Sequence, residues 1–219
     1  MRSLRWPPDS KKPLNPKNLI KEINMTYSII GAGKVGIALA RHFAHAGIEV
    51  SIANTRGPAS LADLAKELGP AVTPVSLQDA LAADTIIFAI PFRAHHEVAG
   101  ALASWNGKVV VDAMNAYGIA PEELQGMAST EVLATALPGA RVVKSFNQLP
   151  AALLATDPAQ DQGRRVMFVA ADDPEASASI AHLATQFGFA PIQLGRIDEG
   201  GRLLKLNGPL LLQNLIKLG

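Results

Sequence analysis

A glycine-rich turn between an apolar run and a helical stretch sets the narrowest limit on how this chain can fold. The segment Gly31-Ala32-Gly33-Lys34-Val35-Gly36 fits the pattern G-x-G-x-x-G, follows the apolar run 27–30 and opens a helical stretch that reaches Ala46. In such a unit the first glycine permits the tight turn, the second lets backbone approach a pyrophosphate, and the third lets the helix pack closely on the strand. Unpaired N–H groups and the helix dipole then favour an anion. The pattern predicts a site for the diphosphate of a dinucleotide, with Lys34 either adding charge there or standing solvated at the helix start.

The rest of the chain indicates a parallel sheet. Short runs rich in Val and Ile alternate with longer Ala- and Leu-rich amphipathic stretches, as expected of strands that feed crossover helices. Runs such as 86–90 and 109–111 are apolar throughout, which is typical of strands covered by helices on both faces. We expect an α/β fold in a single domain, with a Rossmann-type, doubly wound and mostly parallel sheet of about eight strands. The expected strands lie near 26–30, 48–53, 71–75, 85–90, 108–114, 141–147, 164–170 and 190–195, and the clearest helices at 34–46, 60–68, 93–105, 130–137 and 174–187.

The two ends of the chain differ from this pattern. Residues 1–24 contain four prolines and a Lys11-Lys12 pair and lack the apolar core of a signal peptide, so we expect a disordered leader or a misplaced start, with Met25 as an alternative beginning. Residues 25–207 are expected to form the Rossmann-like dinucleotide-binding domain. Residues 208–219 are apolar for a terminus and are expected to form a helix or tail that packs on its own domain or, in a homodimer, on another subunit.

Composition argues against several classes of partner. The formal net charge is +1 and charged residues make up 18% of the chain, which disfavours nucleic-acid binding. The absence of cysteine removes disulfides, thiolate catalysis and Cys-ligated metal sites. No apolar run reaches the roughly 18–20 residues that a membrane span needs. We therefore expect a soluble, cytoplasmic protein with no membrane partner.

The end of the second strand favours NADP over NAD. NAD-binding versions of this unit place an Asp or Glu there to accept from the ribose 2′-hydroxyl. Here the strand ends in Asn54-Thr55-Arg56-Gly57-Pro58, with no carboxylate. The guanidinium fork of Arg56 and the hydroxyl of Thr55 suit a 2′-phosphate. The alternative is that Arg56 is a solvated loop residue and NAD binds equally well.

The ends of the fourth, fifth and sixth strands supply the remaining candidates, because ligands of doubly wound sheets lie across the carboxyl ends of the strands. Pro91 and Phe92 are expected to form an apolar shelf near the nicotinamide. Asn115 and Asn147 could orient the carboxamide or an acceptor, and plain loop or core roles remain open for both pairs. The full candidate set beyond the glycine turn is Asn54, Thr55, Arg56, Ala89, Ile90, Pro91, Phe92, Ala113, Asn115 and Asn147.

No catalytic acid or base is assigned. His95 and His96 are expected on the polar side of the helix 93–105, and His42 and His45 lie on the helix after the glycine turn. They form no H-E-x-x-H arrangement, so surface or helix-capping roles are expected and no metal site. Asp112 is either a general base or an acceptor for backbone and helix N-terminal hydrogen bonds. Hydride transfer between two stacked rings needs no proton relay, which fits reduction of one cofactor by another.

With these residues assembled, the sequence resembles the NADP oxidoreductases dependent on coenzyme F420, a deazaflavin, and bacterial relatives known only as dinucleotide-binding enzymes. The resemblance implies an NADP(H) site at the glycine turn and at 55–56, and hydride exchange with a second redox partner over the nicotinamide. It assigns no residues to that partner, so coenzyme F420 and a flavin both stay open. It runs from Thr26 to about Leu206 and is carried by the segments 29–36, 53–58, 89–92, 110–115, 143–147, 165–173 and 188–191.

Three functions remain in competition. The first is an NADPH-dependent oxidoreductase that passes hydride to a small-molecule acceptor, namely a deazaflavin or a flavin, ferric or quinone acceptor. The second is an NADPH-binding sensor or regulatory module without turnover. The third is a dehydrogenase of small carbonyl or imine substrates, which needs a proton donor that the sequence does not offer.

Overall fold

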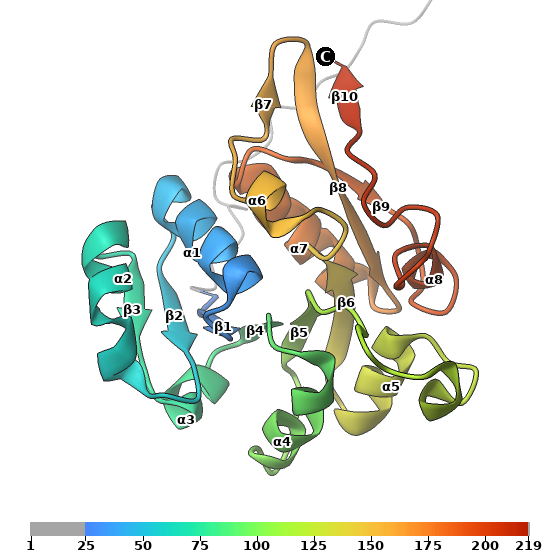
Figure 1. Ribbon diagram of the computed structural model, residues 1–219, viewed down its shortest axis with the longest axis horizontal. Helices are drawn as coiled ribbons and strands as arrows, with labels where there is room; N and C mark the ends of the chain where they lie inside the picture. Colours follow the sequence, from blue (N-terminus) through green and yellow to red (C-terminus); the bar gives the residue numbers. More distant parts are fainter. Residues whose placement is uncertain (1–24, 219) are drawn as a thin grey trace, which may run out of the picture.

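The computed structural model describes residues 25–218, so the expectation for residues 1–24 lies outside it. The strands of this part form one sheet in the order β10-β8-β6-β5-β4-β1-β2-β3, with β7 and β9 also paired to β8. Strands β1 to β6 pair in parallel along this path. The α/β fold with a doubly wound, mostly parallel sheet is confirmed (Figure 1).

The expected strands all occur. Seven are trimmed by one or two residues at one or both ends, and β8 is longer than expected by one residue at each end. Two short strands, β7 and β10, were not expected and bring the total to ten in the described part. The strands are β1 Tyr27–Ile30, β2 Val50–Ala53, β3 Val72–Pro74, β4 Thr85–Phe88, β5 Val109–Asp112, β6 Arg141–Ser145, β7 Ala159–Gln160, β8 Gly163–Ala171, β9 Ala190–Gln193 and β10 Ile216–Leu218. The helices are α1 Lys34–Ala46, α2 Ala62–Leu68, α3 Leu77–Leu81, α4 His95–Gly100, α5 Ser129–Ala136, α6 Ala151–Leu154, α7 Pro174–Gln186 and α8 Gly200–Leu203.

Alternate strand residues supply two apolar layers, one on each face of the sheet. In β5, Val109 and Val111 belong to the layer shared with α1, α6 and α7, whereas Val110 belongs to the layer shared with α3, α4 and α5. The same alternation separates Ile87 from Ile86 in β4. Because side chains of successive strand residues point to opposite faces, an uninterrupted apolar run is what a sheet covered on both sides requires.

The sheet changes direction after β6. The chain passes through α6 and returns by the short hairpin of β7 and β8, so that β8 lies antiparallel to β6. The last strand, β10, pairs antiparallel with the start of β8. The segment 208–219, expected as an apolar helix or tail, therefore contributes turns and an edge strand in its described part instead of a helix.

The helix expected over 93–105 is shorter than the sequence pattern indicates. It begins with the 3-10 helix Phe92–Ala94 and ends at Gly100. The Trp105 side chain folds back into the core, where its indole N–H donates to the Ala99 carbonyl (3.1 Å). Glycine is a weak helix former, which favours an end of the helix at Gly100. The residues between Gly100 and Trp105 form the turn that brings the Trp105 side chain back to the core.

No helix within residues 25–218 is long and apolar enough to cross a membrane.

Candidate cofactor site

In the glycine turn after β1, a side chain would collide with the backbone at two of the three glycines and would find open space at the third. Gly31 adopts φ +112°, and a Cβ built on it would lie 2.3 Å from the Ala89 carbonyl oxygen. A Cβ on Gly36 would lie 1.9 Å from the Gly31 carbonyl oxygen. Around Gly33, in contrast, no atom lies within 4 Å of the added Cβ. The first and third glycines are therefore required by packing, while the second keeps clear the space that a diphosphate would need.

The start of α1 presents uncapped backbone at this open position. Gly33 is the N-cap residue, no side chain caps the helix, and its first turn contains no acidic residue. Gly33 and Lys34 are exposed, and Ala32 and Val35 are half-buried. A thirteen-residue helix with free N–H groups at its start favours a negative charge there. These residues fit a dinucleotide diphosphate.

The segment after β2 turns tightly and carries its polar side chains outward. The Asn54 side chain accepts from the Arg56 backbone N–H (3.0 Å) and donates to the Ser60 hydroxyl (3.0 Å). This Asx turn leaves Thr55 and Arg56 exposed. Within residues 25–218 Arg56 makes no ion pair, since the salt bridges of this part involve other residues. A free guanidinium thus lies one strand away from the glycine turn, to which β2 is tied by the bond from Gly31 N–H to the Ala53 carbonyl (2.8 Å).

The shelf expected after β4 is only partly formed by the residues named for it. Pro91 is exposed, and Ala89 and Ile90 are half-buried. The Phe92 side chain, however, is buried in the apolar layer shared with α4, and its ring packs on His95 with centroids 4.5 Å apart. Phe92 therefore belongs to the core, and Pro91 is the exposed apolar residue of this pair.

Asn115 and Asn147, which are 32 residues apart, meet at the ends of β5 and β6. The Asn115 amide donates to the Asn147 backbone carbonyl, and the Asn147 amide donates to Asn115 Oδ1, both at 3.0 Å. Asn147 also donates to the Leu204 carbonyl (2.8 Å), and its Oδ1 is buried without a partner. The other candidate on this side, Ala113, is buried directly after β5.

Asp112 is fully buried and forms an ion pair with Lys144 (3.1 Å). Its carboxylate also accepts from the Met114 backbone N–H (3.0 Å) and from the Thr130 hydroxyl near the start of α5 (2.7 Å). This geometry fits the role of hydrogen-bond acceptor and leaves no path to a substrate for a general base. Burial lowers the pKa of Lys144, and the adjacent Asp112 carboxylate opposes that lowering.

Sequence reasoning did not single out Lys144. The signal for it was a lysine directly after Val142 and Val143, on the strand next to Asp112.

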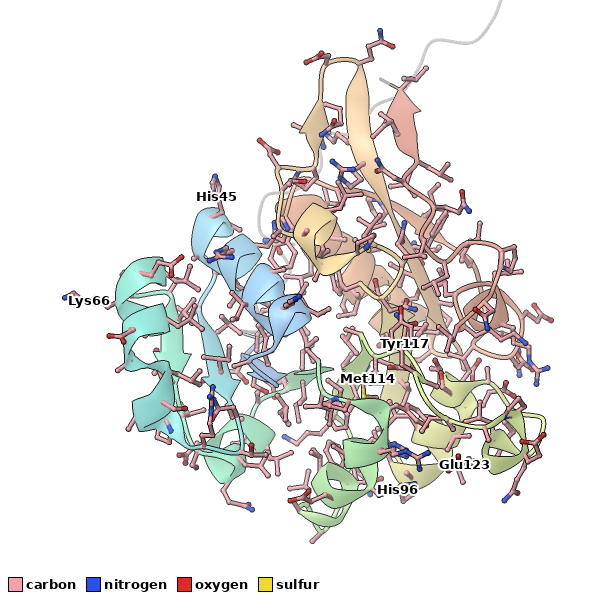
Figure 2. All side chains as sticks on the ribbon, viewed as in Figure 1. His45, Lys66, His96, Met114, Tyr117 and Glu123 are labelled. Carbon is pink, nitrogen blue, oxygen red and sulfur yellow. The ribbon has the colours of Figure 1, made fainter. Side chains whose placement is uncertain are left out.

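Two of the four histidines expected at the surface are buried, which corrects that expectation. His42 hydrogen bonds through Nε2 to the Leu154 carbonyl (2.6 Å) and stacks on Phe187. His95 bonds through Nδ1 to the Phe92 carbonyl, and its Nε2 is buried without a partner. His45 and His96 lie at the periphery (Figure 2). These two rings can be buried in apolar surroundings because one nitrogen of each imidazole forms a hydrogen bond with a backbone carbonyl.

No group of three or more His, Asp or Glu residues within the described part could hold a metal ion. A hollow of about 940 Å³ lies at the amino ends of β1, β2 and β3, beside Met25 and Ser51. That edge is opposite the glycine turn and offers no helix N-terminus. We therefore place the site at the carboxyl edge, on the geometry of the turn and of the polar groups that converge there.

Comparison with known proteins relates the first half of the described chain to a known family. The model of a family described as NADP oxidoreductase, coenzyme F420-dependent, matches residues 26–116. These residues include β1 to β5, the glycine turn and the segment after β2.

Two crystal structures and one curated protein illustrate the similarity. The hypothetical protein SMa0349 from Sinorhizobium meliloti is 43% identical, with a TM-score of 0.84 over 88% of this chain and 96% of that one. A protein from Arthrobacter sp. FB24, named provisionally as an F420-dependent NADP reductase, is 28% identical, with a TM-score of 0.66 over 79% and 86%. The metalloreductase STEAP3 of Rattus norvegicus is 31% identical over 77% of this chain, which spans 33% of its length.

Proposed function

Because this chain belongs to the NADP oxidoreductase family named for coenzyme F420, we propose that it binds NADP(H) along the carboxyl edge of its sheet and transfers hydride between NADPH and a second redox molecule. The observation that carries the proposal is the open position at Gly33, above an uncapped helix start and between two glycines that packing closes. That arrangement leaves room for a diphosphate where the helix dipole favours it.

We assign the two ends of the cofactor to different sides of this edge. The turn Gly31–Gly36 would hold the diphosphate, and Asn54, Thr55 and Arg56 would hold the 2′-phosphate. The half-buried residues Ala89 and Ile90, with exposed Pro91 and the core residue Phe92 next to it, would flank the nicotinamide ring. Ala113, Asn115 and Asn147 would complete this side, with the half-buried amide of Asn115 nearer the surface than that of Asn147. The nicotinamide supplies the hydride, and the protein supplies position and exclusion of water.

For the acceptor we propose a planar ring such as a deazaflavin or a flavin. Tyr117 follows Asn115 by two residues and is 65% exposed. Its backbone N–H donates to the Asn115 carbonyl (2.9 Å), and the neighbouring Gly118 carbonyl accepts from Arg93 (2.9 Å), so the loop is held from both sides. An exposed aromatic ring beside the nicotinamide side offers a stacking face to a planar acceptor.

Turnover tests the function directly. Purified protein would be mixed with NADPH and an acceptor panel of coenzyme F420, FMN, a quinone and ferric citrate, and NADPH oxidation followed. Steady oxidation with at least one acceptor is expected. Tight NADPH binding without turnover on the whole panel would instead favour a sensor, and activity only with carbonyl or imine substrates a dehydrogenase.

Tyr117 separates planar from metallic acceptors. Tyr117→Ala should raise the KM for FMN or coenzyme F420 about fivefold, because roughly 1 kcal/mol of stacking is lost, while the rate with ferricyanide stays unchanged. Tyr117→Phe, which keeps the ring, is the matched control. Ferric ions are the second candidate acceptor, favoured by the similarity to the metalloreductase STEAP3. An equal loss with both kinds of acceptor would argue against stacking.

We further propose a cytoplasmic homodimer, since NADPH is a metabolite of the cell interior and the C-terminal segment exposes a row of leucines. Leu212, Leu215 and Leu218 are 59%, 43% and 65% exposed on and beside the edge strand β10. Exposed apolar side chains in one segment favour association. Size-exclusion chromatography of the protein and of Leu215→Glu/Leu218→Glu tests the dimer: the substituted protein should elute as a monomer, and monomeric elution of both would contradict it.

The boundaries of the domains belong to the same proposal. Residues 25–207 would form the NADP-binding unit, residues 1–24 a leader outside it, and residues 208–219 an appended segment that includes β10. Protein that begins at Met25 should bind NADP⁺ as tightly as the full chain, and a weaker affinity would give residues 1–24 a part in the site.

A further inference from the structure

A buried ion pair lies directly behind the nicotinamide side of the proposed site. Asp112 in β5 and Lys144 in β6 are partners in the strand register, and their side chains are 0% and 1% exposed. They lie on the face of the sheet that packs against α4 and α5, where their strand neighbours Val110 and Val142 are apolar. A charged pair in such surroundings is costly to desolvate, and an apolar pair of similar volume often gives equal or greater stability. Stability alone is therefore a poor reason for its presence.

The two charged side chains bind both backbone polar groups of Met114, its N–H and its carbonyl. Asp112 Oδ1 accepts from the Met114 N–H (3.0 Å), and Lys144 Nζ donates to the Met114 carbonyl. The Thr130 hydroxyl donates to Asp112 Oδ2 (2.7 Å), which fixes the carboxylate against α5. The two side chains thus clamp the peptide groups on either side of Met114, and the next residue along the chain is Asn115.

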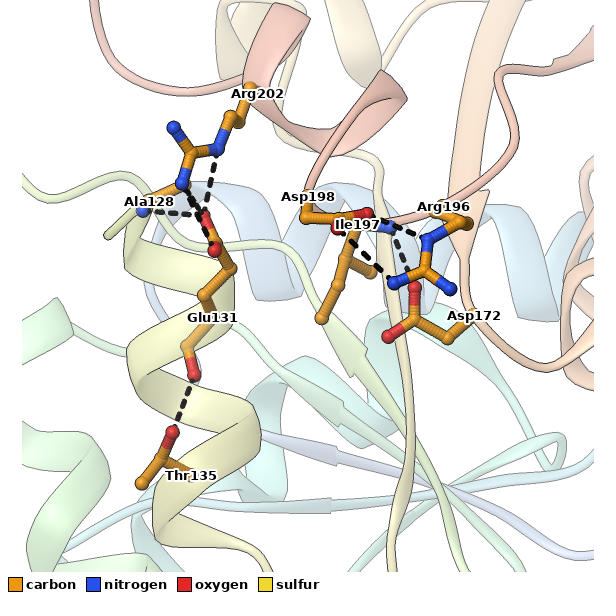
Figure 3. Close-up of polar contacts among 8 residues, drawn as sticks. All are labelled: Ala128, Glu131, Thr135, Asp172, Arg196, Ile197, Asp198 and Arg202. Atoms are coloured by element: carbon orange, nitrogen blue, oxygen red, sulfur yellow. Dashed lines mark hydrogen bonds and ion pairs between the residues drawn. The ribbon is translucent and has the colours of Figure 1, made fainter. Parts of the chain in front are cut away.

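From this clamp the contacts continue to the edge of the sheet. Asn115 and Asn147 exchange two hydrogen bonds, and Asn147 donates to the carbonyl of Leu204, the C-cap residue of α8. Helix α8 is itself tied to α5, because Arg202 pairs with Glu131 through two bonds of 3.1 Å (Figure 3). Glu131 also accepts from the Ala128 N–H at the start of α5 (2.7 Å). The backbone at Met114 is therefore the point from which the orientation of the two asparagines is set.

We propose that Lys144 is a positioning residue for the nicotinamide half of the cofactor, acting through Met114 on Asn115 and Asn147. The inference rests on the proposed function, because it assumes that the two asparagines face the nicotinamide. Lys144 contacts neither the glycine turn nor the segment 54–58, so its effect should be confined to one half of the dinucleotide.

The test compares the whole cofactor with a fragment that lacks the nicotinamide. NADP⁺ and 2′,5′-ADP are titrated against the protein and against Lys144→Met/Asp112→Asn, a double variant that leaves no unpaired buried charge. The affinity for NADP⁺ should fall about tenfold to a hundredfold, as expected for one or two misplaced hydrogen bonds. The affinity for 2′,5′-ADP should stay within about twofold.

Lys108→Met is the matched control. Lys108 Nζ also donates to two backbone carbonyls, those of Ala82 and Ala83 (3.1 and 2.8 Å), but at the amino edge of the sheet. It should leave both affinities unchanged. If the double variant loses affinity for both ligands equally, or for neither, Lys144 has no positioning role. If the unaltered protein binds neither ligand, the proposed function fails first.

A double-mutant cycle adds a readout that a general loss of stability would not move. Asn115→Ala is combined with Lys144→Met/Asp112→Asn, and the affinity for NADP⁺ is measured for each protein. If Lys144 acts partly through Asn115, the combined loss should be clearly smaller than the sum of the two separate losses. Fully additive losses would overturn the proposal.

Discussion

The two sides of the carboxyl edge are built in different ways. On the side of β1 and β2, the groups that face outward are backbone N–H groups at Gly33 and exposed side chains at Thr55 and Arg56. On the side of β5 and β6, the polar groups are the half-buried amide of Asn115 and the buried amide of Asn147, held by a network that includes Asp112 and Lys144. In the proposed site, the first side would bind phosphate by charge and open space. The second side would hold the nicotinamide ring in one orientation, and the buried ion pair would supply the rigidity.

The largest difference between an effect on stability and an effect on cofactor affinity is expected within the glycine turn, between Gly36 and Gly33. Gly36→Val should destabilise the fold by about 3–5 kcal/mol, because its Cβ would overlap the Gly31 carbonyl oxygen. Gly33→Val has open space around its Cβ and should unfold at nearly the same temperature as the unaltered protein. Its affinity for NADP⁺ should nevertheless fall at least about a hundredfold, since the side chain occupies the space for the diphosphate.

Thermal unfolding and cofactor titration of the two variants check this separation. Retention of normal NADP⁺ affinity by a folded Gly33→Val protein would place the diphosphate elsewhere.

A second contrast sets Asn147 against Thr55. Asn147 is 3% exposed, and its amide bonds both to Asn115 and to the Leu204 carbonyl. Asn147→Ala should cost about 2–3 kcal/mol of unfolding free energy, because it leaves a buried carbonyl unpaired. Thr55→Ala, at an exposed turn, should change the stability by about 0.5 kcal/mol or less. Denaturant unfolding of both variants measures the difference, and equal losses would contradict the view that only one side is a rigid network.

The contrast also explains what could be predicted from the sequence. The first side depends on residues close together in the chain, so its glycines and the Asn54–Arg56 turn could be predicted from spacing and residue type. For Asn115 and Asn147, the sequence predicted that both lie at the same edge of the sheet, but it did not predict the hydrogen bonds between them. The clamp by Lys144 could not be predicted, because a single lysine in an apolar strand does not show which residue 30 positions away it faces.

The fold could be predicted further than the site. Strand positions follow from apolar runs, and all eight expected strands occur. The burial of Phe92, His42 and His95 could not be predicted, because each depends on which helix covers which face of the sheet. The end of α4 at Gly100 depends in the same way on the long-range packing of Trp105.

The smallest expected effect is a dependence of stability on pH, which arises mainly from the buried His42. Burial lowers the pKa of His42, His45 adds to the lowering, and the bond to Leu154 and the charge of Asp157 oppose it. The unfolded chain then binds a proton more readily than the fold below about pH 6.5, so the stability falls as pH decreases through that range. His42→Phe should flatten the decline between pH 7 and pH 5.5, whereas substitution of exposed His182 by Gln should not.

His95 contributes to the decline in the same direction. Burial lowers its pKa and His96 adds to the lowering, while the bond to Phe92 and the charge of Asp112 oppose it. The effect of His42 is measured by the melting temperatures of His42→Phe and His182→Gln between pH 7 and pH 5.5. If the melting temperature of His42→Phe declines with the same slope as that of the unaltered protein, His42 is not the source of the pH dependence.

The preference for NADP over NAD depends most directly on Arg56, and one titration tests it. NADPH and NADH are titrated against the unaltered protein and against Arg56→Ala. The affinity for NADPH should fall about tenfold to a few hundredfold, because a charge-assisted hydrogen bond to the 2′-phosphate is lost. The affinity for NADH should change by less than about threefold. Equal losses for the two cofactors, or equal affinities of the unaltered protein for both, would contradict the NADP site described above.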